Sequence, residues 1–231
     1  MQLTRSSEKR DGLTSVLLGS GLVALLVGFY MALSAPPDAN QGWLVRILYL
    51  HVPMAWLCYL AIFGTLAYSV AYLVRRNPKY DRVAAVSAEI GLMFSALTVL
   101  SGALWGRPTW GVYWTWEPRL TTFAILIAVY VGYFIVRSAI EDPELRANAS
   151  AAIGILGSIN VPISYMSVKW WRSLHQTQTI DLTTGRINME PAMLLALMVN
   201  LLAFTLLYFA LMRLRGAVAK RAAERFEAQH G

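Results

Sequence analysis

The sequence has few charged residues and only one cysteine. Only 14% of its 231 residues are charged and 57% are hydrophobic, against roughly 25% and 45–50% in an ordinary soluble domain. A water-soluble globule is therefore excluded. Cys58 lies in an apolar stretch and has no second thiol, so disulfide bonds and C-x-x-C chemistry are excluded within this chain.

Catalytic and phosphate-binding motifs are missing as well. The sequence contains no G-x-x-x-x-G-K-[ST] loop, so any ATP hydrolysis linked to this protein belongs to another chain. No nucleophile with a partner base is apparent, and we expect a binding protein and not an enzyme. The net charge of +7 follows the membrane topology given below, so no nucleic-acid partner is expected; the basic residues face a lipid bilayer.

Long apolar runs are what the sequence has instead. A run of about 20 residues crosses the hydrocarbon layer as a helix. We therefore predict an all-α, polytopic integral membrane protein that forms a single membrane domain over residues 1–231. The six predicted spans cover about residues 15–34, 50–73, 83–104, 120–138, 148–167 and 192–212.

The distribution of lysine and arginine predicts the orientation. Six spans place both termini on one side, and that side holds fourteen of the 20 basic residues. The opposite side holds the other six, which are Arg46, Arg107, Arg119, Lys169, Arg172 and Arg186. Because cytoplasmic loops carry the excess of Lys and Arg, both termini are predicted to be cytoplasmic.

All eight tryptophans fall on the non-cytoplasmic side of this topology. They are Trp43, Trp56, Trp105, Trp110, Trp114, Trp116, Trp170 and Trp171. An ordinary aromatic belt populates both interfaces. Two interpretations stay open: tyrosines supply the inner belt and the tryptophan bias is partly chance, or the outer face builds an apolar platform for a large planar ligand.

The segment 105–119 is the densest part of this aromatic side. Gly106 and Pro108 are predicted to prevent a long regular helix here. If the chain is extended, Trp114 and Trp116 lie on one face. Glu117 and Arg119 are expected to form a charge pair at the membrane surface.

Two of the three histidines share this side. His51 lies at the outer end of the second span and His175 in the last outer loop, whereas His230 lies in the tail, where no role is expected. A lone interfacial histidine is usually hydrogen-bonded or solvated. No Cys or carboxylate cluster has zinc spacing, and two axial nitrogens beside flat aromatic walls suit a haem. Candidates for pairing its propionates are Arg46, Arg107, Arg119, Lys169 and Arg172.

Few polar residues lie inside the spans. Glu89 is either a proton-relay carboxylate or, by preference, the partner of Arg82 or Arg137. Asn160, followed by Val161 and Pro162, is expected to loosen the fifth span, and Asn200 to bond across helices.

These residues resemble a known family. The segment from Trp105 to Thr121 is similar to the W-G-x-x-x-W-G-x-x-W-x-W-D-x-R-L-T pattern of the CcmC-type haem-handling proteins of cytochrome c maturation, which carry a periplasmic tryptophan-rich (WWD) domain. The stretches 49–53 and 160–176 are also similar, and the resemblance covers about residues 43–213. One departure is Glu117, which stands where the family has Asp and is followed by Pro118.

The resemblance implies that His51 and His175 are axial ligands of haem b, carried as cargo, and that the periplasmic WWD segment 105–120 holds the macrocycle. The other expected haem contacts are Trp105, Trp110, Trp114, Trp116, Glu117, Arg119, Trp170 and Trp171. It further implies a multi-pass protein of the bacterial inner membrane that presents haem to the periplasmic chaperone CcmE. Its partners would be the other subunits of an ABC-type complex: a separate ATPase, a membrane subunit and a small CcmD-like subunit.

Two other functions compete with haem delivery. A secondary transporter would carry polar or broken helices near the midplane in repeated halves, and here midplane polarity is sparse and no convincing repeat is found. A structural membrane subunit would use its outer loops only to dock partners. Haem bound to the purified protein would distinguish haem delivery from both of these alternatives.

Overall fold

The computed structural model describes residues 12–176 and 179–230, except for the side chains of residues 226, 227 and 230. His230 is therefore outside the described side chains. The helices are α1 (Gly12–Ser34), the 3-10 helix η1 (Trp43–Ile47), α2 (Leu48–Arg75), α3 (Pro78–Trp110), α4 (Pro118–Ala139), α5 (Pro143–Ser158), α6 (Asn160–Trp170) and α7 (Pro191–His230). A short hairpin, β1 (Ile180–Asp181) and β2 (Arg186–Ile187), precedes α7.

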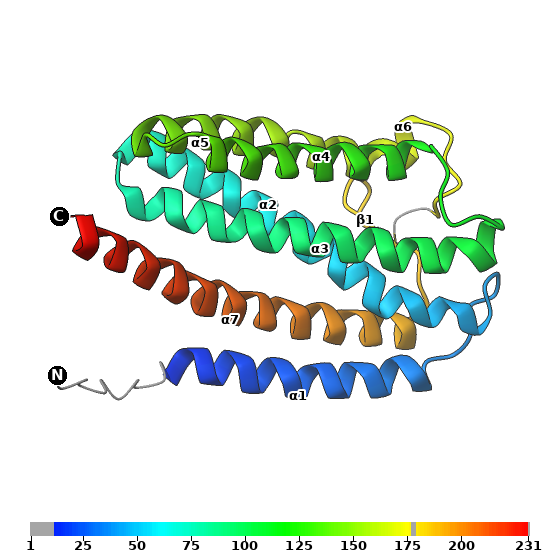
Figure 1. The fold of residues 1–231 in the computed structure, drawn as a ribbon. Helices are drawn as coiled ribbons and strands as arrows, with labels where there is room; N and C mark the ends of the chain where they lie inside the picture. Colours follow the sequence, from blue (N-terminus) through cyan, green and yellow to red (C-terminus); the bar gives the residue numbers. More distant parts are fainter. Residues whose placement is uncertain (1–11, 177–178, 231) are drawn as a thin grey trace.

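Six helical segments are long and apolar enough to cross a membrane, counting η1 with α2 and α5 with α6. This confirms the predicted all-α, polytopic membrane fold. Figure 1 shows the start of α1 and the end of α7 at one end of the bundle, and the loops after α1, α3 and α6 at the other. The cytoplasmic side of the termini stays a prediction, and three of its basic residues, Arg5, Lys9 and Arg10, lie outside the described residues.

Three helices begin with the same local signal. Asn77, Glu117 and Asp142 cap α3, α4 and α5 by accepting a hydrogen bond from a backbone N–H of the first turn, and each is followed by proline. Proline suits the first helical position because its missing N–H has no intrahelical partner there. The turns that the sequence marks with charged residues and proline therefore become helix starts.

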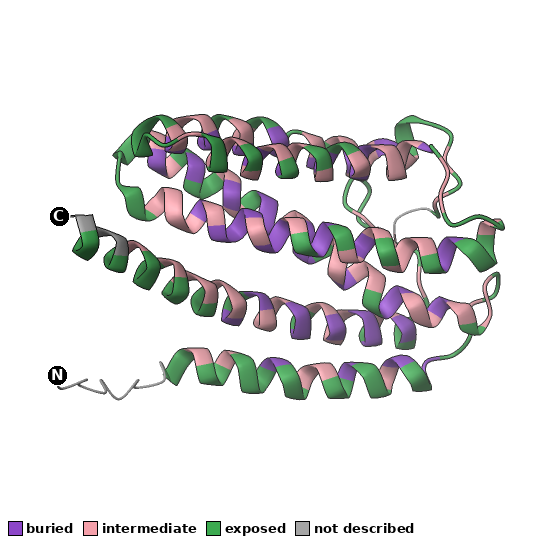
Figure 2. Ribbon diagram, in the orientation of Figure 1, coloured by how far each residue is buried: buried purple, intermediate pink, exposed green. Residues whose placement is uncertain are grey.

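The core lies among α2, α3, α4 and α7, while α1 packs against α7. Figure 2 shows the buried residues on the inward faces of these helices and exposed residues on their outward faces. The outward residues are largely apolar, among them Leu26 and Leu100, as expected where lipid and not water surrounds the helices. Asn200 on α7 donates to the Gly28 carbonyl oxygen of α1 at 2.9 Å, which confirms the expected bond across helices.

The third span is longer than predicted. Gly106 and Pro108 do not stop α3, which continues to Trp110. Pro108 lies in the last turn, where its missing N–H costs the one intrahelical bond to the Leu104 carbonyl oxygen and the helix still continues for two residues. The helix ends at Gly111, whose φ of 82° is readily adopted only by glycine. Trp105 and Trp110 therefore project from a rigid helix end and not from a loop.

The partner predicted for Glu89 is wrong. Glu89 on α3 accepts two hydrogen bonds from Arg215 on α7, at 2.6 and 2.9 Å. Arg137 instead forms a two-bond pair with Asp81. Sequence spacing within one helix did not reveal Arg215 because it arrives from the last helix of the chain.

The fifth span is interrupted as expected. α5 ends at Ser158 and α6 begins at Asn160. The Asn160 amide donates to the Thr122 carbonyl oxygen of α4 at 2.7 Å. This bond fixes the start of α6 against α4, next to Arg119, which is three residues before Thr122.

Candidate functional site

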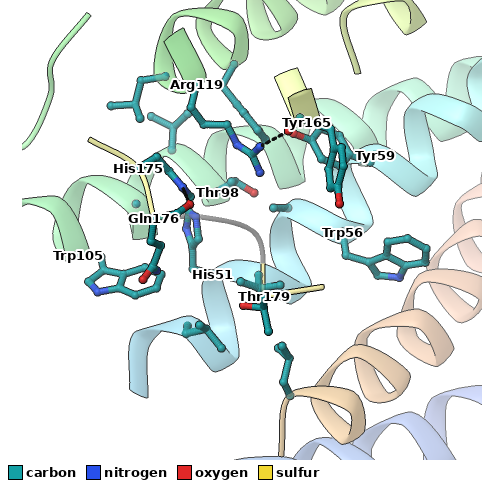
Figure 3. Close-up of a pocket in the computed structure, with 18 of the residues that line it drawn as sticks. His51, Trp56, Tyr59, Thr98, Trp105, Arg119, Tyr165, His175, Gln176 and Thr179 are labelled. Carbon is teal, nitrogen blue, oxygen red and sulfur yellow. Dashed lines mark hydrogen bonds between the residues drawn. The ribbon is translucent and has the colours of Figure 1, made fainter. Parts of the chain in front are cut away.

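A cavity of about 750 Å³ lies at the loop end of the bundle. Residues of α2, α3, α4, α6 and α7 line it, together with the loop that joins α6 to α7, and the lining is mostly apolar. Its volume falls within the roughly 300–1,000 Å³ of small-molecule sites. Figure 3 shows His51 and His175 pointing into this cavity from different parts of the chain.

His51 reaches the cavity from the first turns of α2. Its Nδ1 lies 3.0 Å from the Ser101 Oγ of α3. Ser101 has one hydroxyl hydrogen, which it donates to the Leu97 carbonyl oxygen at 2.8 Å. Ser101 Oγ therefore accepts from His51, and we assign the ring proton to Nδ1, which leaves the Nε2 lone pair free. Gly102 gives the ring its room, since a Cβ there would lie 3.0 Å from His51 Cε1.

His175 reaches the cavity from the loop after α6. Its Nδ1 lies 3.0 Å from the Gln176 carbonyl oxygen. A carbonyl oxygen only accepts, so Nδ1 carries the proton and Nε2 again holds a free lone pair. Burial, with the nearby Arg119 charge, lowers the pKa of His175 to about 4. The imidazole is therefore neutral at neutral pH, the form that binds a metal.

The tryptophans nearest the histidines fix their rings. The Trp105 indole meets His51 edge to face at a centroid distance of 5.6 Å, and the Trp110 indole lies 6.2 Å from His175. Both come from the end of α3. Each imidazole thus has an indole from the same rigid helix beside it.

Trp114 and Trp116 lie in contact but face different surroundings. Their rings meet at 5.4 Å, nearly perpendicular. Trp114 lines the cavity, whereas Trp116 is 75% exposed and is not among the lining residues. The extended segment after α3 therefore offers one indole to the cavity and one to the outside.

Two glutamines that we did not select from the sequence join the two histidine segments. Trp105 Nε1 donates to Gln41 Oε1 at 2.9 Å, and Gln41 Nε2 donates to Gln176 Oε1 at 2.6 Å. Gln176 also supplies the carbonyl oxygen that accepts from His175. This chain of bonds connects the loop after α1, the end of α3 and the loop after α6. Loop glutamines have no periodic pattern, so no sequence signal indicated them.

We expect replacement of Gln41 by alanine to loosen the loop that carries His175. Two hydrogen bonds are lost, and each contributes about 0.5–1.5 kcal/mol. Amide hydrogen exchange should therefore become faster in residues 171–176, with little change in α3. Asn40→Ala is the matched control, because the Asn40 side chain is exposed and only its backbone N–H is bonded. Equal exchange in the two variants would contradict the proposed link.

Arg119 is the only side chain with a fixed charge among the described residues that line the cavity. Its Nη1 donates to the carbonyl oxygens of Ser164 and Tyr165 on α6, at 3.0 and 3.2 Å. The other N–H groups of the guanidinium remain for a ligand. Figure 3 shows the guanidinium directed toward the interior of the cavity, near Tyr59 and Tyr165. The site is thus an apolar chamber with one fixed cation.

Glu117 and Arg119 do not form the predicted charge pair. Glu117 is buried, and its Oε1 accepts from the Leu120 N–H at 2.7 Å while its Oε2 accepts from the Ser173 hydroxyl. Ser173 Oγ in turn accepts from the His175 N–H at 3.1 Å. Because a helix N-cap needs an acceptor, the carboxylate is directed to the start of α4 and to the loop. Glu117 therefore holds the His175 loop from outside the cavity lining.

The remaining predicted residues lie away from the cavity lining. Trp170 and Trp171 contact each other and are more than half exposed. Among the proposed propionate partners, three bind elsewhere and a fourth, Arg172, is exposed. Arg46 donates to the Leu33 carbonyl oxygen, Arg107 to the Gly111 carbonyl oxygen, and Lys169 to Asp181.

The lining also includes aromatic residues that the sequence did not single out as site residues, notably Trp56 and Tyr59 of α2. Both lie within the second span, where an aromatic side chain is usually a packing residue. The Tyr59 hydroxyl lies 3.1 Å from the Ser164 hydroxyl, so α2 meets α6 beside Arg119. Periodicity alone does not tell a cavity wall from a packed helix face.

Comparison with known proteins gives consistent matches. A family model described as "CcmC: Heme exporter protein C" matches residues 4–229. A protein named heme exporter protein C from Bradyrhizobium diazoefficiens is 39% identical over 84% of this chain and 74% of its own length. A protein of the same name from Escherichia coli K12 is 34% identical over 86% of this chain and 81% of its own length. An Arabidopsis thaliana protein named as a putative cytochrome c biosynthesis ccmC-like mitochondrial protein is 33% identical over 88% of this chain and 78% of its own length.

Proposed function

Because this chain belongs to the CcmC family of haem exporter proteins, we propose that its cavity binds haem b as cargo, with His51 and His175 as the axial iron ligands. The family gives the chain a role in haem handling for cytochrome c maturation. The observation that carries the proposal is that His51 and His175 both point into one apolar cavity, and each has its Nδ1 beside an acceptor oxygen. Each Nδ1–H is held by an acceptor, the arrangement typical of metal-binding histidines.

The donor set fits haem better than a free metal ion. No group of three or more His, Cys, Asp or Glu side chains that would hold a metal ion occurs among the residues described. Two imidazoles alone leave a zinc ion short of its usual four ligands, whereas a porphyrin supplies four nitrogens itself. Trp105, Trp110 and Trp114 supply aromatic surface for the macrocycle. Arg119 is the cation for a propionate, because its planar fork matches a carboxylate.

We further propose that the bound haem is presented outward to a CcmE-type chaperone within an ABC-type complex. The loop end of the bundle exposes Trp116, Trp170 and Trp171, and aromatic side chains are favoured at interfaces. We assign these three residues to contact with the chaperone and not to contact with the haem macrocycle. At the other end, the basic C-terminal part of α7 reaches beyond the last apolar run. That part is the surface we assign to a separate ATPase subunit on the cytoplasmic side.

Visible absorption of the purified protein tests the central proposal. After incubation with haemin and removal of unbound haem, we expect about one haem per chain, with a Soret band typical of two nitrogen ligands. The apo protein incubated with protoporphyrin that lacks iron is the control for binding by aromatic surface alone. Protein that retains no more haemin than iron-free porphyrin would contradict axial ligation.

A further inference from the structure

The haem cavity extends below the outer loops into the membrane-spanning part of the bundle. Its lining follows α2 from His51 to Phe63, a distance of about 18 Å along a helix that rises 1.5 Å per residue. On the facing helix it follows α7 from Leu197 to Thr205. Both stretches repeat at helical spacing, so α2 and α7 each turn one stripe toward the cavity.

The side chains of this wall remain partly exposed. Trp56 and Phe63 of α2 and Leu202 of α7 line the cavity within the spans and are 44%, 47% and 56% exposed. One side-chain hydrogen bond bridges the two helices at this level, from Trp56 Nε1 to Thr205 Oγ1 at 3.0 Å. We call the stretch of α2 and α7 defined by Trp56, Phe63, Leu202 and Thr205 the α2–α7 seam.

Deeper in the membrane the three helices α2, α3 and α7 contact one another closely. The Tyr208 hydroxyl of α7 lies 3.2 Å from the Ser87 hydroxyl of α3. A Cβ on Gly64 would lie 2.5 Å from Ser87 Oγ and 3.1 Å from the Tyr208 hydroxyl oxygen. α2, α3 and α7 therefore come close together at Gly64, Ser87 and Tyr208. A second cavity, which Phe63, Gly64 and Tyr208 line, lies beside this contact on the side of the termini.

We propose that haem enters the cavity sideways from the outer half of the bilayer, through the α2–α7 seam. The inference rests on the proposed haem function and adds the route of loading. The haem macrocycle is apolar and its propionates are charged, so in a bilayer the ring lies in the outer hydrocarbon and the propionates point to the headgroups. Lipid therefore brings the ring to Trp56 and Leu202 while the propionates stay at the outer surface, the side on which Arg119 lies. Opening requires loss of the Trp56–Thr205 hydrogen bond, after which the iron reaches His51 one to two turns higher on α2.

The way α7 packs against its neighbours supports movement of this wall. α7 packs mainly against α1, and it meets α2 and α3 less extensively. Figure 1 shows α1 and α7 together on one side of the bundle, with α2 to α6 on the other. A small outward shift of the α1–α7 pair would widen the seam and leave the His51, Ser101 and Trp105 contacts between α2 and α3 unchanged.

Reversible cross-linking of the seam tests the route. In a Cys58→Ala background, Trp56→Cys and Thr205→Cys are joined by a short bifunctional reagent with a reducible link, and haem uptake from haem-containing phospholipid vesicles is followed by the Soret band. Joining the helices should slow uptake by about tenfold or more, as expected when an opening step controls access. Reduction of the link should restore the rate in the same sample.

The control joins an equivalent hydrogen-bonded pair elsewhere. Arg213 Nε donates to Thr14 Oγ1 at 3.0 Å, so Thr14→Cys with Arg213→Cys ties α1 to α7 and leaves the seam free. This link should not slow uptake. Equal uptake by the seam protein before and after cross-linking would overturn the lateral route. Haem would then enter between the outer loops, and the partly exposed seam would be only a surface that lipid acyl chains cover.

The route and the haem function fail in different ways. Seam protein loaded with haem before cross-linking should keep its haem content, since the link does not touch the histidines. If the uncross-linked protein and the wild type bind no haem at all, the proposed function is overturned, and the route with it. If the cysteine pair does not fold, Leu202→Trp serves as the second test: it narrows the seam from the exposed side and should slow uptake without lowering the final haem content.

Discussion

Replacement of His51 or His175 by alanine should abolish stable haem retention, and this is the largest effect we expect. Removing a partner that only orients a metal ligand typically costs 10–100-fold in affinity, and removal of the ligand itself should cost at least that much. The iron would keep one imidazole, so the absorption spectrum should change from a six-coordinate to a five-coordinate form. The measurement is haem stoichiometry and the Soret position of each purified variant.

Added imidazole distinguishes loss of a ligand from loss of structure. Imidazole enters the space left by the missing ring and should restore the six-coordinate spectrum in each alanine variant. Ser101→Ala is the matched control for His51, because it removes the acceptor of Nδ1–H and leaves the ligand in place. It should weaken haem binding less than His51→Ala does. Unchanged haem content in both alanine variants would defeat the assignment of the two ligands.

The sequence was informative where the physics is local and periodic. Six apolar runs predict six spanning helices because the bilayer thickness sets their length. Three spans carry their own start signal, an N-cap acceptor followed by proline. The expected interruption at Asn160 is also confirmed. Its signal is local too, because Asn160 is followed directly by Val161 and Pro162.

The parts that the sequence did not predict depend on contacts between distant segments. Glu89 pairs with Arg215, which is 126 positions away. Gln41 and Gln176 meet 135 positions apart and have no pattern of their own. Glu117 was expected to pair with Arg119, two residues on, but the start of α4 and the hydroxyl of Ser173 take its oxygens. Hydrogen-bond demand at a helix end outweighed attraction between neighbouring charges.

Selection among the cations also required the fold. Five basic residues on the outer side were equal candidates for a propionate, and side-chain type does not rank them. In the structure Arg119 alone of the five lines the cavity. Its place follows from the break between α5 and α6, since Asn160 fixes α6 to α4 and brings the Ser164 and Tyr165 carbonyl oxygens to the guanidinium.

Arg119→Gln is the second change for which we expect a large effect. Glutamine keeps hydrogen-bonding capacity toward the α6 carbonyl oxygens and removes the one fixed charge found among the described residues of the cavity lining. A hydrogen bond to a charged group contributes about 1.5–3 kcal/mol, so haem affinity should fall by roughly 10–100-fold. The measurement is the dissociation constant for haemin, obtained from the Soret band.

Haem dimethyl ester makes this prediction specific to the propionate. Esterification removes the carboxylate charges, so the ester should bind the wild type more weakly than haemin does. In the Arg119→Gln variant haemin and the ester should bind about equally, because no cation is left to distinguish them. This comparison separates a propionate contact from a purely structural role: a guanidinium that only joined α4 to α6 would weaken haemin and ester binding by the same factor. Equal losses for the two ligands would therefore remove Arg119 from the propionate site, while the assignment of the histidines would still stand on its own evidence.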